Sequence, residues 1–271
     1  MLRLLFIAFF VASATSSNAD DARLKRLATA DENRGWEAVG RLDIGGKRFC
    51  TGALIAPNLV LTAAHCLFEK ESGTRINHEK IEFLAGWRDG RASAYRWVRR
   101  AVVHPDYSYS ARLDAARVGN DVALLELYHP IRNTRVVPFE TDSQPGAGDR
   151  IGVVSYALNR SEAPSMQEVC RVKAWEMGVL VMSCDVDFGS SGAPVFTFDD
   201  DGTPRIVSVI SGMAVVDDER VSLGTQLEKP LALLKAKLAE GNGFFSAANG
   251  PKTKRLAIGA RGDNGAKFVK P

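Results

Sequence analysis

The sequence of 271 residues lacks the features that mark a nucleic-acid partner, a membrane span or a metal site. Its 35 Lys and Arg nearly balance 32 Asp and Glu, so no basic excess favours nucleic acid. A membrane-spanning helix needs about 18 consecutive apolar residues. Beyond the first residues, no apolar run approaches this length. His78, His104 and His129 lie too far apart along the chain for the usual metal-ligand spacing. We therefore expect no nucleic-acid partner, no membrane span beyond the first residues, no metal and no cofactor.

The first 19 residues have the pattern of a secretory signal peptide. Arg3 precedes an apolar run, 4–12, that is too short to span a bilayer, and the small residues Ser17 and Ala19 precede Asp20. A buried N-terminal helix is the alternative interpretation of the same run. Export would place the cysteines in an oxidising setting. The pattern predicts a signal peptide at 1–19 and a secreted or periplasmic protein.

Short runs of strand-forming residues dominate the stretch 36–225. Residues 52–57, 59–62 and 151–156 are examples, and turn residues separate the runs. With 45% hydrophobic residues the chain can bury a substantial core, which excludes disorder throughout. Because this stretch has no long helical periods, it predicts an all-β fold of the sandwich or barrel type.

The end of the chain combines a predicted helix with a basic tail. Four leucines at offsets of four, three and four, with a proline in the first turn, predict the helix: Leu227, Pro230, Leu231, Leu234 and Leu238. The helix should pack its apolar face on the β structure and end near Gly241. Residues 241–271 hold six Lys or Arg and one Asp with little apolar periodicity. They predict a disordered tail that folding and catalysis do not need.

Three segments carry the residue types that nucleophilic catalysis requires. A serine hydroxyl becomes a good nucleophile when a neutral histidine takes its proton, and that histidine needs a buried carboxylate to orient it. The chain supplies His65 in Thr-Ala-Ala-His-Cys, Asp121 in Asn-Asp-Val-Ala-Leu, and Ser191 in Gly-Ser-Ser-Gly-Ala-Pro. Because Ala193 replaces the last glycine, the third segment is not the Gly-x-Ser-x-Gly elbow of α/β-hydrolases, whose Ser, Asp, His order also differs.

In this order, the three segments are similar to those of the trypsin/chymotrypsin serine proteases. The resemblance implies a serine endopeptidase in which His65, Asp121 and Ser191 form a catalytic triad. Such an enzyme acts on polypeptide substrates through an acyl-enzyme. Glycine on both sides of the nucleophile lets the backbone bend tightly, so the N–H groups of Gly189 and Ser191 are expected to form the oxyanion hole.

The resemblance covers about residues 32–240 and also implies a fold. It is two packed antiparallel β-barrels of the chymotrypsin type, with a boundary near residue 138 and a C-terminal helix. We expect this protease domain at residues 20–240 and expect it to be a monomer.

Four cysteines permit three disulfide pairings. By the resemblance, Cys50 pairs with Cys66 and closes the loop that leads to His65. Cys170 then pairs with Cys184 and braces the segment before the nucleophile. Closing a loop of this size contributes about 3 kcal/mol in the chain-entropy model. A free or metal-bound cysteine is the alternative.

Two features depart from the animal members of the family. Their residue before the nucleophile is an aspartate that pairs with a new N-terminal ammonium after zymogen cleavage, whereas this chain has Ser190. The usual Ile-Val-Gly-Gly start is also missing, and the first barrel is expected to begin in the segment 36–42. Activation through that ion pair is therefore not expected, and the pattern is more similar to the bacterial secreted and periplasmic branch.

Substrate specificity depends on the pocket for the P1 residue. Counting back six residues from Ser191 without gaps reaches Asp185, where the resemblance implies a preference for Arg or Lys, because an unpaired carboxylate favours a cation. A gapped alignment would place Asp187, or neither aspartate, in the pocket. Ser211 and Met213 are expected in the pocket wall.

Two alternatives to an endopeptidase stay open at this point. One is a catalytically silent binding protein on the same fold, and the other is a secreted esterase. Active-site labelling separates the first from an enzyme, and ester turnover without peptide cleavage would indicate the second.

Overall fold

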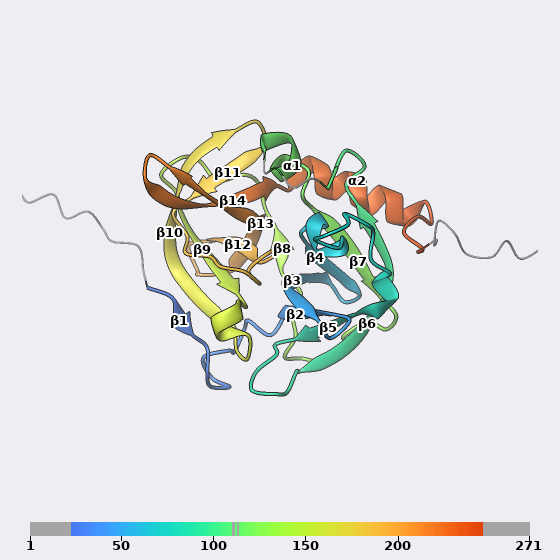
Figure 1. Ribbon diagram of the computed structural model, residues 1–271. Coiled ribbons are helices and arrows are strands. Elements are labelled where there is room, and N and C mark those ends of the chain that lie inside the picture. Colours follow the sequence, from blue (N-terminus) through green and yellow to red (C-terminus); the bar gives the residue numbers. More distant parts are fainter. Residues whose placement is uncertain (1–22, 110–111, 113, 246–271) are drawn as a thin grey trace, which may run out of the picture.

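Figure 1 shows the computed structural model of the chain, which describes residues 23–109, 112 and 114–245. The expected signal peptide at 1–19 and the part of the expected tail beyond residue 245 lie outside these residues. None of the helices in the described part of the chain is long and apolar enough to cross a membrane.

Six antiparallel strands close the first barrel in the order β2, β3, β4, β7, β6 and β5 (Figure 1). A Cβ at Gly40 in β2 would lie 2.3 Å from Cε2 of Phe83 in β5, so the missing side chain lets this ring fill the barrel interior. The bounds are β2 Val39–Ile44, β3 Arg48–Ala56, β4 Leu59–Thr62, β5 Ile81–Ala85, β6 Ala94–Val103 and β7 Ala123–Leu127.

The second barrel follows the order β10, β11, β14, β13, β12 and β9, and pairing of β9 with β10 closes it. A short strand β1 (Lys25–Arg26) adds to β10 on the outside, and β8 (Glu140–Thr141) pairs with β13. The two-barrel fold is therefore confirmed. The bounds are β9 Arg150–Ser155, β10 Ser165–Glu176, β11 Val179–Met182, β12 Pro194–Phe198, β13 Pro204–Val216 and β14 Glu219–Gln226.

The C-terminal helix α2 (Glu228–Ala239) forms where the leucine spacing predicted it. It buries Leu231, Leu234 and Leu238, and it contacts β6 and β7 of the first barrel (Figure 1). A helix at the end of the second barrel thus packs on the first and ties the two together. The described part of the chain also holds α1 and short 3₁₀ turns, at Ala115–Gly119, Ala64–Leu67, His78–Lys80 and Leu158–Arg160.

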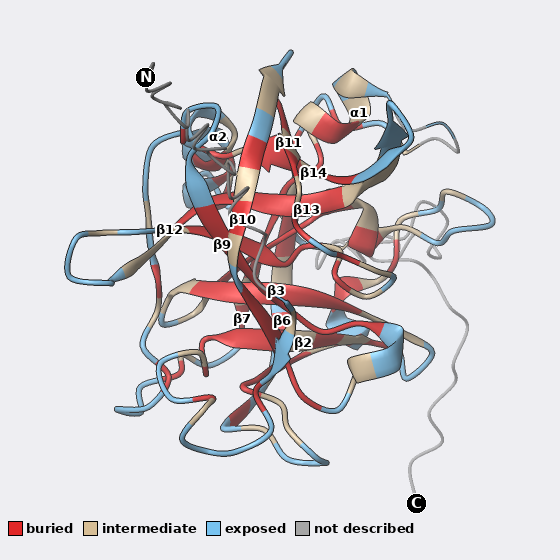
Figure 2. Ribbon diagram, turned by 90° about the vertical axis from the view of Figure 1, so that its left-hand side faces the viewer, coloured by how far each residue is buried: buried red, intermediate tan, exposed pale blue. Residues whose placement is uncertain are grey.

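Buried residues follow the strands of both barrels (Figure 2). An aromatic group joins the barrels: the ring centroids of Trp36 and Phe139 lie 5.2 Å and 4.8 Å from that of Phe196 in β12. The backbone N–H of Phe139 also donates to the carbonyl of Leu54 in β3, at 2.9 Å. These contacts hold the connection between the barrels, close to the boundary expected near residue 138, against both of them.

The segment immediately after α2 differs from the expected free tail. The backbone carbonyl of Gly243 accepts a hydrogen bond from Ala101 N in β6, at 2.8 Å. The Arg100 guanidinium donates to the carbonyl of Asn242 and lies 5.4 Å from the ring centroid of Phe244. The tail boundary expected at residue 241 is therefore several residues too early. Apolar periodicity does not reveal this segment, because backbone hydrogen bonds and a single ring contact hold it to the barrel, not a repeating apolar face.

Truncation tests this docked segment. A chain that ends after Gly241 loses the hydrogen bonds to Asn242 and Gly243 and the contact between Arg100 and Phe244, whereas a chain that ends after Phe245 keeps them. We expect the shorter chain to lose about 1–3 kcal/mol of unfolding free energy. The chain that ends after Phe245 should unfold like the full chain in thermal and urea denaturation. Equal midpoints for both truncations would show that the segment contributes nothing to stability.

Candidate active site

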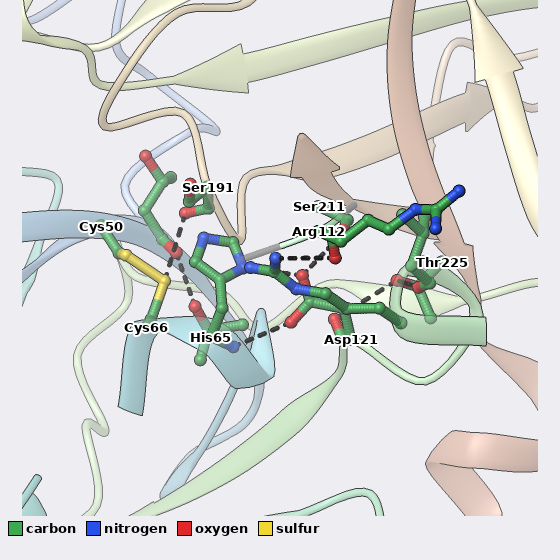
Figure 3. A network of polar contacts seen from close by, with 12 residues as sticks. Cys50, His65, Cys66, Arg112, Asp121, Ser191, Ser211 and Thr225 are labelled. Carbon is green, nitrogen blue, oxygen red and sulfur yellow. Dashed lines mark hydrogen bonds and ion pairs between the residues drawn. A yellow bond between two sulfur atoms is a disulfide. The ribbon is translucent and has the colours of Figure 1, made fainter. Parts of the chain in front are cut away.

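Both barrels contribute side chains to one polar site between them (Figure 3). His65 lies in the 3₁₀ turn that follows β4, and Asp121 lies two residues before β7. Because Thr62 of β4 pairs with Ala123 of β7 in antiparallel register, His65 and Asp121 leave the sheet at the same end. Ser191 precedes β12 and so comes from the second barrel.

The Asp121 carboxylate fixes the orientation of the His65 ring. Asp121 is 1% exposed, and its Oδ1 accepts from the backbone N of His65 at 2.8 Å. Its Oδ2 lies 2.6 Å from His65 Nδ1. A carboxylate has only acceptors, so Nδ1 carries the proton and Nε2 is left as the basic nitrogen. This is the tautomer that a general base for a serine hydroxyl requires.

Two residues of the second barrel hold Asp121 as well. Ser211 Oγ of β13 donates to Asp121 Oδ2, and Thr225 Oγ1 of β14 donates to the Asp121 carbonyl at 3.3 Å. The Ser211 side chain therefore points at the carboxylate. The sequence analysis had expected Ser211 in the wall of the P1 pocket. Thr225 was missed, because a threonine inside a regular strand carries no local signal of function. Figure 3 includes Arg112 in the same network of polar contacts.

The charge of Asp121 also affects the pKa of a buried tyrosine, Tyr107. Burial raises the pKa of the Tyr107 hydroxyl well above its ordinary value, and the negative charge of Asp121 raises it further. Tyr107 therefore stays neutral, so it adds no second negative charge beside the carboxylate.

The backbone of Ser191 is anchored beside His65. Its carbonyl accepts from the backbone N of Thr51 in β3 at 2.9 Å and lies 3.9 Å from Cys66 Sγ. Figure 3 shows Ser191 on the side of the His65 ring away from Asp121. Within the described residues no hydrogen bond joins the Ser191 hydroxyl to the ring. The hydrogen bond between a nucleophile and its base is often long in the absence of substrate. In this structure the position of Ser191 is set by its backbone hydrogen bond to Thr51.

Glycines on both sides of Ser191 allow the loop to approach the first barrel. Gly189 has φ of +99° and Gly192 has φ of +77°. A Cβ would lie 2.4 Å from Cε2 of Phe49 at Gly189, and 2.4 Å from the carbonyl O of Thr51 at Gly192. In the described part of the chain, the backbone N–H groups of Gly189 and Ser191 donate to no protein acceptor. Both donors expected in the oxyanion hole are therefore available to a ligand.

Two disulfides brace this region. Cys50 joins Cys66 and links β3 to the turn that carries His65, while Cys170 joins Cys184. Both pairs are the expected ones: the resemblance implied the first, and the second joins the two remaining cysteines. Cys50 and Cys66 lie close to His65, but each sulfur is bonded to the other, so neither is a thiolate that could bind a metal.

The expected pocket residues lie only partly together. Asp185 and Met213 line a cavity of about 200 Å³ with Arg220, a residue that the sequence analysis missed. The Arg220 guanidinium donates to the Val186 carbonyl at 3.5 Å. Asp185 is exposed, and its carboxylate accepts no hydrogen bond from the described residues.

Asp187 has a different task in the same region. Its Oδ1 accepts from the backbone N of Phe188 at 2.7 Å, so it supports the nucleophile loop. The cavity that Asp185 and Met213 line is not bordered by Asp187. The gapped alternative for the P1 pocket therefore gains no support from the geometry.

In sequence, the chain is similar to known proteases. Residues 50–204 match the family model described as the trypsin-like peptidase domain. Human serine protease 23 is 28% identical over 216 residues, which is 67% of this chain and 56% of that protein. A trypsin from Phaedon cochleariae is 36% identical over 84 residues, covering 31% of this chain and 29% of that protein.

A solved structure of a Glu endopeptidase in complex with MPD shares the fold. It is 18% identical, has a TM-score of 0.64, and the match covers 82% of this chain and 97% of that one. The chain spans about half the length of human serine protease 23. Both named sequence relatives are animal proteins, so they lend no support to the expected similarity with the bacterial branch.

Proposed function

Because the chain belongs to the trypsin-like peptidase domain family, we propose that it is a serine endopeptidase that hydrolyses peptide bonds through an acyl-enzyme. Ser191 is the nucleophile, His65 the general base and Asp121 the residue that orients and stabilises His65. The observation that carries this proposal is the 2.6 Å contact between His65 Nδ1 and the buried Asp121 carboxylate. It leaves Nε2 free to take a proton.

The reaction follows from these positions. Ser191 Oγ attacks the carbonyl carbon of the substrate while His65 Nε2 takes the hydroxyl proton. The carbonyl oxygen becomes an oxyanion, which the free N–H groups of Gly189 and Ser191 stabilise. His65 then gives its proton to the leaving amine, and the C–N bond breaks. Water, deprotonated by His65, attacks the acyl carbon; the bond from that carbon to Ser191 Oγ breaks, Oγ regains the proton from His65, and the acyl group leaves as a carboxylic acid.

The proposal also covers export of the protein and activity without further cleavage after the signal peptide is removed. The disulfides favour an oxidising compartment, in agreement with a signal peptide at 1–19, so we place the protein outside the cytoplasm. The protease domain extends from residue 20 to the docked segment after α2. Ser190 is a buried, neutral side chain that cannot pair with an N-terminal ammonium. Activity should therefore need no trypsin-type trimming.

The cavity lined by Asp185, Met213 and Arg220 serves as the P1 pocket, and Asp185 gives it a modest preference for Arg or Lys. Its carboxylate borders the cavity and accepts no hydrogen bond from the described residues, whereas Arg220 donates to the Val186 carbonyl. A substrate cation would pair with Asp185, but the charge of Arg220 in the same cavity reduces the gain.

Fluorophosphonate labelling tests the proposed catalytic roles. The probe phosphonylates an activated serine with loss of fluoride, so wild type should be labelled and Ser191→Ala should not. His65→Ala and Asp121→Ala should lower kcat on a peptide substrate by about 10⁴-fold or more, and the losses should not add. Peptide cleavage that survives in Ser191→Ala would contradict the mechanism. Absence of labelling in wild type would favour a silent binding protein, and ester turnover without peptide cleavage an esterase.

A library of peptides with a randomised P1 residue tests the pocket. Wild type should cleave after Arg and Lys more readily than after Leu, Ala or Glu, because only the cations pair with Asp185. Asp185→Ser should lose this preference, while Arg220→Ser should strengthen it by removing the opposing charge. Preferred cleavage after Glu, or an unchanged profile in Asp185→Ser, would reject the assignment.

A further inference from the structure

Behind the nucleophile loop lies a half-buried guanidinium that the catalytic mechanism does not use. Arg160 follows β9 and turns back toward the barrel. Its Nη1 donates to the Ser155 carbonyl at 2.9 Å and to Ser155 Oγ at 3.0 Å, and its Nη2 donates to Ser190 Oγ at 3.4 Å. One side chain therefore joins the end of β9 to the residue before the nucleophile.

Ser190 is the centre of this contact. It is fully buried, and its Oγ accepts from the backbone N of Asp187 at 3.3 Å as well as from Arg160. The same hydroxyl lies 3.3 Å from the Tyr156 carbonyl and from Ser155 Oγ, either of which can take its proton. A hydroxyl has one donor and two acceptor sites, so the Arg160 bond completes its capacity.

The loop also carries the charges that balance Arg160. Burial lowers the pKa of Arg160, while the carboxylates of Asp185 and Asp187 act in the opposite direction. Arginine keeps its charge under such conditions. Asp187 also caps the backbone N of Phe188, so the ionic attraction acts on the segment that precedes Gly189.

The described residues nearest the N-terminus, which begin at residue 23, lie elsewhere. Lys25 and Arg26 form β1 on the outside of β10, and Leu27 N donates to the Pro164 carbonyl at 2.9 Å. Among the described residues, the cation that donates to Ser190 is the half-buried side chain of Arg160.

We propose that Arg160 is a positioning residue that holds the segment 187–191 in its active form by linking Ser190 to Ser155 and β9. This inference rests on the proposed peptidase function. The loop presents the N–H groups of Gly189 and Ser191, so loss of Arg160 should weaken stabilisation of the oxyanion more than binding of the substrate. The built-in guanidinium makes a newly exposed N-terminal ammonium unnecessary.

The test compares the full chain with Arg160→Met, Arg160→Lys and Arg171→Met. Arg171 is a matched control, because it is also half-buried and donates to a carbonyl, that of Gly148, away from the nucleophile loop. The readouts are the rate of fluorophosphonate labelling, kcat and KM on a peptide amide, and Ki of a peptide aldehyde. The aldehyde forms a tetrahedral adduct whose oxygen occupies the oxyanion hole. Unfolding midpoints are measured for every variant.

Arg160→Met should lower the labelling rate and kcat at least about 10-fold and raise the aldehyde Ki by a similar factor, with little change in KM. A smaller folded fraction alone would lower kcat but would leave Ki and KM unchanged. Arg160→Lys, which keeps the charge but not the forked donors, should fall between wild type and Arg160→Met, and Arg171→Met should match wild type.

If Arg160→Met does not fold, Arg160→Lys decides the matter: wild-type labelling and Ki in that variant would overturn the inference. Unchanged Ki and labelling in a folded Arg160→Met would also overturn it, while leaving the proposed function intact. A wild type without Ser191-dependent labelling would overturn both.

Discussion

The buried Asp121 carboxylate is the group on which the geometry of the site depends. A buried charge is costly unless hydrogen bonds compensate it, and here the donors come from both barrels. His65 of the first barrel supplies its backbone N and Nδ1, and Ser211 of the second supplies its hydroxyl. Thr225 holds the backbone of the same aspartate. This one residue therefore sets the orientation of the imidazole and links the two barrels at the site.

Close contact between the barrels at the nucleophile loop is the second constraint. A Cβ at Gly192 would lie 2.1 Å from Thr62 Oγ1, so only glycine lets the loop settle on the end of β4. The hydroxyl of Thr51 donates to the carbonyl of Gly189 at 2.9 Å and accepts from the backbone N of Tyr156 at 3.1 Å. On its other side the loop meets Ser155 and Arg160. Backbone contacts, more than the Ser191 side chain itself, thus place the nucleophile.

Local patterns in the sequence predicted the elements but not the contacts between distant segments. Leucine spacing identified α2, and the segments around His65 and Asp121 identified two residues that the β4–β7 register brings together. The structure placed Ser211 differently, because its hydroxyl reaches across the barrels to a residue 90 positions away. Arg160 was missed for a similar reason: only the fold brings it to Ser190. Apolar periodicity likewise did not reveal the docked segment 242–245, which is held by backbone hydrogen bonds and by the contact between Arg100 and Phe244.

The most direct test of this account is proton NMR of the hydrogen bond between His65 Nδ1 and Asp121, with ¹⁵N-labelled histidine for assignment. The folded wild type should show a strongly deshielded Nδ1–H resonance, downfield of the amide protons. It should persist in Ser191→Ala, since the pair does not need the nucleophile, and it should vanish in His65→Ala and Asp121→Ala. A folded wild type without this resonance, or a resonance that survives in Asp121→Ala, would contradict the claim that the buried carboxylate orients the catalytic base.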